Sequence, residues 1–139
     1  MTTQNDLSDP PDDIDLAMHL EQIGGKLRRS KSGRVLSVDF RESPASVDTE
    51  LAKQLIRLPR LKEIYLPQTA IGDGALDALL NLKRLTVLNL DGTTVSDIHM
   101  DRILELEKLT LLSITDTQVS REKVAELRKK MIGTRIVFR

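Results

Sequence analysis

The sequence has no cysteine and no tryptophan, and its 139 residues include only two histidines, one tyrosine and two phenylalanines. The absence of cysteine excludes disulfides, thiolate metal sites, cysteine nucleophiles and iron–sulfur clusters. His19 and His99 are too few for a histidine-rich metal site. Three aromatic residues leave little surface on which nucleic-acid bases could stack. We therefore expect neither a metal nor another cofactor.

The chain also has no excess of charge and no long apolar run. Its 21 Lys and Arg residues balance 21 Asp and Glu residues, which argues against general coating of nucleic acid or membrane but leaves a local patch possible. The first fifteen residues carry five Asp and no basic residue, unlike a secretory signal. No segment is long and apolar enough to span a bilayer. A cytoplasmic location is the expectation.

The composition of the sequence changes after residue 13, which separates an N-terminal tail from the rest of the chain. Residues 1–13 are polar and acidic and contain Pro10 and Pro11, so we expect a disordered tail. The remainder, residues 14–139, is long enough for a single domain. Its first apolar residues, from Ile14 to Ile23, recur at helical spacing, and the following Gly24 and Gly25 are typical of a helix end.

Internal repetition is the strongest pattern in the chain. Leu61, Leu85 and Leu109 recur with a 24-residue period, and eight positions keep this period in three copies. One further step reaches Ile136 and Phe138, which predicts a final strand. A looser copy begins upstream, where the step from Val38 to Ile64 is longer than the regular one, so two extra residues must lie between Phe40 and Leu55. The eight positions begin at Leu58, Leu61, Ile64, Leu66, Thr69, Ile71, Leu76 and Leu79.

Each repeat predicts a strand, a turn and a helix or helical turn. Its L-x-L segment has the period of a half-buried strand, and in the upstream copy this pattern turns Leu36, Val38 and Phe40 inward. The recurring Thr69, Thr93 and Thr117 can pair backbone groups that the turn leaves free. Ser96 and Ser120 precede the helical segments as N-caps, and Asp73 and Asp97 favour the first helical turn.

These units resemble the leucine-rich-repeat family, and they are most similar to short bacterial-type repeats. The segments Thr69–Asp73 and Thr93–Asp97 carry the T-x-[IV]-x-D pattern, although Thr stands where many members have Asn or Cys, and Gly72 where Ser or Thr is usual. The resemblance covers about residues 35–139. It implies an α/β fold, namely a short right-handed solenoid with a parallel sheet on the concave face and helices on the convex face. A helix and hairpin at about 14–45 would cap it.

The family resemblance implies a protein-binding module whose repeats carry no catalytic residues. The strand residues that alternate with the core would then form the concave surface, where Tyr65, Val87 and Leu111 expose apolar area to a protein partner. No nucleotide-binding loop, serine-hydrolase elbow or zinc-protease motif is present, so we expect no enzyme. The candidate binding residues are Asp39, Arg41, Glu63, Tyr65, Val87, Asn89, Asp91, Leu111, Ser113 and Arg135.

Two alternatives remain open at this point. The segment Lys26–Arg34 holds five cations and no acid, and on a hairpin it could bind a polyanion or nucleic acid. Such binding would weaken steeply with salt, unlike an apolar contact. Alternatively, the last strand leaves an edge that could join copies of the chain or a larger assembly. The candidate cations are Lys26, Arg28, Arg29, Lys31 and Arg34.

Overall fold

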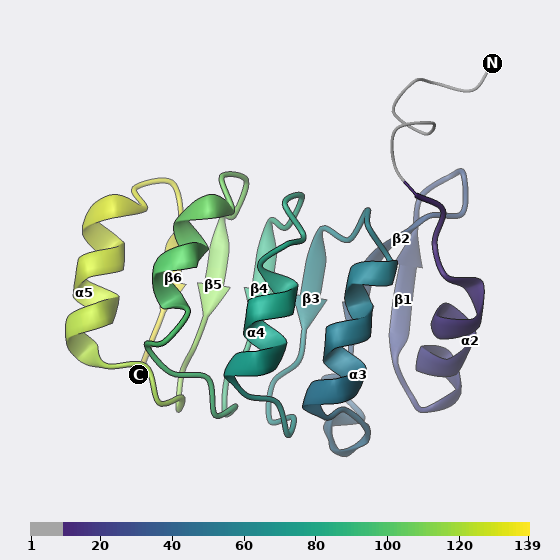
Figure 1. Ribbon diagram of the computed structural model, residues 1–139, viewed down its shortest axis with the longest axis horizontal. Helices are drawn as coiled ribbons and strands as arrows, with labels where there is room; N and C mark the ends of the chain where they lie inside the picture. The colour runs from purple at the N-terminus through teal and green to yellow at the C-terminus, as the bar shows by residue number, and fades with distance from the viewer. Residues whose placement is uncertain (1–9) are drawn as a thin grey trace.

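The short strands of successive repeats pair side by side and build one six-stranded sheet in the order β1-β2-β3-β4-β5-β6 (Figure 1). The computed structural model describes residues 10–139. The strands are β1 (Lys26–Arg29), β2 (Val35–Asp39), β3 (Glu63–Tyr65), β4 (Val87–Asn89), β5 (Leu111–Ser113) and β6 (Arg135–Val137). Only β1 and β2 pair antiparallel, and the other neighbours pair parallel.

Helical segments connect the parallel strands and cover one face of the sheet (Figure 1). Because each connection returns on the same side, the fold has two layers, one of strands and one of helices. Helix α2 precedes the sheet and lies beside β1. The helices are α2 (Ile14–Gln22), α3 (Thr49–Lys53), α4 (Asp73–Leu79) and α5 (Arg121–Lys130), with shorter 3-10 segments η1 (Pro44–Ser46), η2 (Gln54–Arg57) and η3 (Met100–Glu105).

The strand register confirms the 24-residue repeat. Ile64, Leu88, Leu112 and Ile136 are direct partners across β3 to β6, and Val38 pairs with Ile64 over the longer upstream step. The two extra residues lie early in the connection after β2. Already at residue 47 the Val47 carbonyl accepts the Ala70 N–H, just as the carbonyl of Ile71 accepts the N–H of Thr94 one repeat later.

The repeated apolar residues make one continuous core between the sheet and the helices. Leu61, Leu85 and Leu109 are at most 3% exposed. The recurring threonines serve the role that their position predicts, since each hydroxyl donates to the carbonyl three residues earlier. These bonds join Thr69 to Leu66, Thr93 to Leu90 and Thr117 to Ile114 at 2.7–2.8 Å.

Helix α2 forms where the sequence predicts it. The Asp13 carboxylate caps its first turn by accepting the N–H of Leu16, and Gly24 adopts a φ of +104° after its end. Ile14, which fits the helical apolar spacing, is nevertheless 71% exposed.

The predicted acidic tail at residues 1–13 lies mostly outside the described residues, but its last four residues make defined contacts. The Pro10 carbonyl accepts a bond from Arg34, and the carboxylate of Asp12 accepts the N–H of Val35 at 2.7 Å. Asp13 also donates its N–H to the Arg57 carbonyl. Residues 10–13 are therefore attached to the domain.

A row of polar side chains links each repeat to the next. Thr49, Asp73 and Asp97 occupy equivalent positions, and each accepts the backbone N–H of the residue 23 positions later, at 2.8–3.0 Å. The two aspartates also accept hydroxyl bonds from Ser96 and Ser120. The prediction that Ser96 is an N-cap is wrong, since η3 begins only at Met100, whereas Ser120 does cap α5.

One strand prediction is also wrong. The expected inward alternation of Leu36, Val38 and Phe40 fails at its first residue, because Val35 is fully buried and Leu36 is half-buried. The cause is an irregularity in the β1–β2 pairing, where the register shifts between Arg28 and Arg29. Such a bulge re-aims the side chains next to it.

The cross-repeat aspartates give a stability prediction. Replacing Asp97 by Ala removes two hydrogen bonds and leaves the N–H of Ser120 without its partner. We expect a loss of about 1–3 kcal/mol in the free energy of unfolding, measured by urea denaturation. Glu107→Ala, which removes an exposed carboxylate, is the control. Equal midpoints for the two variants would contradict the role assigned to Asp97.

Candidate functional site

The face of the sheet opposite the helices, here called the open face, carries the alternate side chains of the strands. Because strand partners stand directly opposite one another, these residues form two columns across the sheet. One column runs Ser37, Glu63, Val87, Leu111 and Arg135, and the other runs Asp39, Tyr65, Asn89, Ser113 and Val137. Most are partly exposed, but Ser37 and Ser113 are buried at 5% and 8% exposure.

Val87 and Leu111 form an apolar pair in the middle of the open face. They are direct partners in β4 and β5, and both are half-buried. Their neighbours in the same column are Glu63 on one side and the exposed Arg135 on the other. An apolar centre flanked by charged residues is the arrangement found at protein contacts.

Tyr65 lies at the centre of a group of polar contacts beside this pair. The Arg41 guanidinium stands 4.2 Å from the centre of the Tyr65 ring, within the range of a cation–π contact. The Tyr65 hydroxyl donates to Glu63 at 3.2 Å. Burial, followed by the charge of Glu63, raises the pKa of Tyr65, so its hydroxyl keeps its proton at neutral pH. The ring is therefore held in one orientation.

Arg41 is in turn fixed by Asp39. Its guanidinium donates to both carboxylate oxygens of Asp39, the shortest bond being 2.7 Å from Nη2 to Oδ2. Partial burial alone would raise the pKa of the Asp39 carboxyl, but the hydrogen bonds and charge of Arg41 outweigh it and leave the pKa below its ordinary value. The Asp39–Arg41 pair is thus charged throughout the neutral range.

The other end of the open face is ordered by Asp91, which follows β4. Its carboxylate accepts the Ser113 hydroxyl and the N–H of Thr115, both at 2.7 Å. The Asn89 side chain accepts the N–H of Asp91 at 3.0 Å. Asn89, Asp91 and Ser113, all predicted to bind a partner, are therefore already engaged with one another, and Ser113 exposes little of its surface.

Two cations that the sequence placed in the separate basic hairpin belong to the open face. Lys26 stands opposite Asp39, and Arg28 stands opposite Ser37 and pairs with Glu63 at 3.4 Å. This extension of the open face was not predicted. The alternation of Lys26, Leu27 and Arg28, with Leu27 packed on the core, is the strand pattern that indicates it.

The predicted basic hairpin is largely neutralised by acidic neighbours. Four of its five cations form ion pairs: Lys26 with Glu42, Arg28 with Glu63, Arg29 with Glu21 and Arg34 with Asp12. Lys31 is exposed and has no acidic partner within residues 10–139. These ion pairs reach acids on different elements and lower the net charge that the hairpin could offer to a polyanion.

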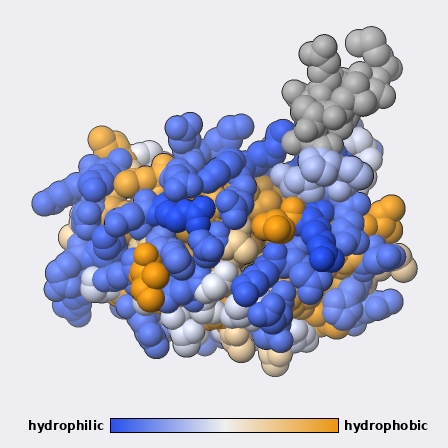
Figure 2. Space-filling view, viewed as in Figure 1, coloured by the Kyte–Doolittle hydropathy of each residue, from blue (hydrophilic) through white to orange (hydrophobic). Residues whose placement is uncertain are grey.

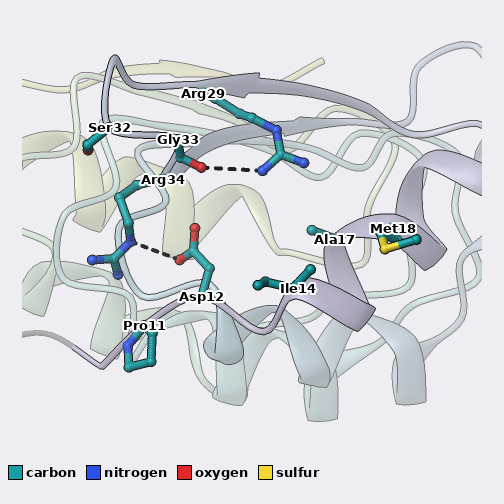
Figure 3. Close-up of a pocket in the computed structure, with 9 residues that line it drawn as sticks. All are labelled: Pro11, Asp12, Ile14, Ala17, Met18, Arg29, Ser32, Gly33 and Arg34. Atoms are coloured by element: carbon teal, nitrogen blue, oxygen red, sulfur yellow. Dashed lines mark hydrogen bonds and ion pairs between the residues drawn. The ribbon is translucent and has the colours of Figure 1, made fainter.

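A hollow of about 330 Å³ lies between α2 and the turn that joins β1 to β2 (Figure 3). Ile14, Ala17 and Met18 supply its apolar side. Asp12 pairs across it with Arg34 at 3.3 Å, and the Arg29 guanidinium donates to the Gly33 carbonyl. The first of these contacts attaches Asp12 to the hairpin and the second lies within the hairpin, so the polar groups of the hollow have a structural role.

The outer edge of β6 is partly blocked. The Arg135 N–H and the Val137 carbonyl bond toward β5, so the backbone groups of Ile136 point to the open edge. Arg128 of α5 donates to the Ile136 carbonyl at 2.9 Å. A partner strand at this edge would have to displace that guanidinium, which disfavours the predicted edge pairing.

The rest of the surface of residues 10–139 shows fewer features of a binding site than the open face. On the helix-covered side, hydrophilic residues dominate and apolar ones form small separate patches (Figure 2). Within residues 10–139, no three His, Asp or Glu residues gather in a group that could hold a metal ion. None of the helices in that range has the length and apolar character to cross a membrane.

The fold is similar to that of internalins, which are leucine-rich-repeat proteins. Internalin C2 of Listeria monocytogenes matches 63% of this chain at 25% identity with a TM-score of 0.50. A second internalin of that organism (inlF) matches the same share at 20% identity and a TM-score of 0.50. The chain covers only 36% and 26% of their lengths. No family model and no curated protein match the sequence.

The Asp39–Arg41 pair gives a prediction on pH. Removing the guanidinium in Arg41→Ala leaves burial, which raises the pKa of Asp39, and the backbone N–H of residue 41 and Lys26, which lower it, so the pKa rises toward its ordinary value. A lowered pKa of Asp39 stabilises the fold above pH 3.8, and this stabilisation is lost as the pH falls through the lowered value. The variant, whose pKa is less lowered, therefore has less of this stabilisation to lose in acid. Carboxyl-carbon NMR titration measures this. Arg121→Ala is the control, and an unshifted Asp39 in Arg41→Ala would contradict the pairing.

Proposed function

We propose that this protein is a non-catalytic protein-interaction module that binds its partner through the open face of the sheet. In this proposal the repeats form a short right-handed leucine-rich-repeat solenoid, the open face is its concave side, and α2 with the β1–β2 hairpin caps one end. Internalin-like structural neighbours support a protein-interaction role in general.

The observation that carries the proposal is the apolar pair Val87–Leu111 next to the fixed ring of Tyr65. Tyrosine and arginine contribute strongly at protein interfaces, and side chains that are already oriented lose less entropy on binding. At the Tyr65 end the cations have acidic partners, so that end offers shape and aromatic surface more than net charge. A protein surface with a small apolar protrusion fits this chemistry best.

The test is affinity capture from a lysate of the source organism with wild type and with the double variant Tyr65→Arg, Leu111→Arg. Two charged side chains in the centre of an interface leave buried charge without partners, so we expect capture to fall at least about tenfold. The captured protein, once identified, is then titrated by calorimetry against both purified forms. Circular dichroism and the melting temperature establish that the variant is folded.

The matched control is Ile98→Arg, Ile132→Arg. Ile98 and Ile132 are 74% and 92% exposed, and neither belongs to the open face. This variant introduces the same two charges in place of two exposed apolar side chains and should keep wild-type capture. Loss of the partner in the control, or its retention by both variants, would place the binding site elsewhere.

A further inference from the structure

Arg135, at the β6 end of the open face, differs from the cations at the other end. Lys26, Arg28 and Arg41, which belong to the β1 and β2 side, each pair with a carboxylate. Arg135 is exposed on the strand at the opposite end of the sheet (Figure 1). No acidic side chain within residues 10–139 pairs with it. Its positive charge is therefore available to a partner.

Arg135 continues the column that contains the apolar pair. It stands opposite Leu111, and Leu111 stands opposite Val87 in the next strand. The two apolar side chains are half-buried, whereas Arg135 is exposed. These three residues thus present apolar surface and then positive charge in one line across β4, β5 and β6.

Two carboxylates border this line and restrict where an acidic group of a partner can lie. Glu63 is the neighbour of Val87 on the β3 side. Asp91 holds its carboxylate beside the second column by accepting the Ser113 hydroxyl at 2.7 Å, and this neutral donor does not cancel its charge. Like charges placed close together across an interface repel. An acidic group of the partner is therefore favoured beside Arg135 and disfavoured on the other sides of the apolar pair.

We propose that the partner contacts the open face through an extended segment that carries an apolar residue and, two positions away, an Asp or Glu, a proposal that rests on the proposed function of this face. The apolar side chain covers Val87 and Leu111, and the carboxylate pairs with Arg135. The segment crosses the strands, so that its length runs along the column from β4 to β6.

The separation of two positions follows from the geometry of sheets. Neighbouring strands lie about 4.8 Å apart, so the middle of the Val87–Leu111 pair is about 7 Å from Arg135. An extended chain advances about 3.3 Å per residue, and its alternate side chains point the same way. Residues two positions apart therefore span this distance with both side chains on the open face, whereas adjacent residues would point to opposite sides.

The two contacts have different roles in recognition. The apolar contact supplies most of the affinity, because it removes apolar surface from water. An exposed ion pair contributes less, since water and salt screen it. The guanidinium of Arg135 nevertheless offers parallel donors that fit a carboxylate, and it repels a cation. Arg135 is therefore a specificity-determining residue, which selects acidic segments among apolar ones.

The experiment is a selection of random dodecapeptides displayed on phage, with the full-length protein as bait. We expect the peptides enriched on the wild type to carry an apolar residue and an acid two positions apart. On Arg135→Glu, the same pattern should appear with Lys or Arg in place of the acid. Lys129→Glu, which reverses an exposed cation on α5, is the matched control and should enrich the wild-type pattern. Circular dichroism establishes that each variant is folded.

One enriched peptide is then titrated against the purified proteins by fluorescence anisotropy. Arg135→Gln should weaken its affinity about threefold, the effect of losing an exposed ion pair. Changing the acid of the peptide to Gln should weaken binding to the wild type by the same factor. Both changes together should weaken binding no more than either alone, because each removes the same ion pair. Additive losses, or an acid that stays enriched on Arg135→Glu, would overturn the proposal.

The variant Tyr65→Arg, Leu111→Arg separates this proposal from the proposed function. Peptides that lose binding to this variant but show no preference for an acid would overturn the role of Arg135 and leave the open face as the binding site. Peptides that bind the variant as tightly as the wild type would place their site elsewhere and overturn both. Failure to enrich any peptide would overturn the extended segment, and the capture experiment then decides the proposed function.

Discussion

Each repeat depends on its neighbours for the burial of its leucines and for the pairing of its backbone. A strand of three residues, such as β3 or β4, cannot hold a sheet position alone, and its inward residues Ile64 and Leu88 are fully buried only because adjacent repeats supply the surrounding core. The carboxylates of Asp73 and Asp97 add a polar link between the same repeats. Stability therefore comes from the interfaces between repeats.

This dependence affects the two ends of the sheet most, because the repeat at each end has a neighbouring repeat on one side only. At the N-terminal end, antiparallel β1 completes the edge of β2, and α2 buries Leu16 and Leu20 against the core. At the other end Arg128 bonds to an outward carbonyl of β6 instead of a further strand. The two ends thus differ, because added elements cover the first, whereas at β6 a single side chain bonds to one outward carbonyl.

The core and the strand register could be predicted because the 24-residue spacing itself determines which residues stack. The alternation of apolar and polar residues gave wrong predictions where pairing between backbone groups far apart in the sequence decides which way a side chain points. Leu36 is only half-buried because of the register shift between Arg28 and Arg29, and Arg28 belongs to the open face because of its antiparallel partner Ser37. The bonds of Asp73 and Asp97 to the next repeat were also missed, since a helix-start position explains an aspartate without them.

The charges of the open face follow from which residues the strand pairing places side by side. On the open face, opposite charges occupy adjacent strands, as in Arg28 with Glu63, so they neutralise one another. A face whose charges are paired discriminates partners by shape more than by net charge. The pairing of the strands, which the repeat fixes from β3 onward, therefore sets the electrostatic character of the open face.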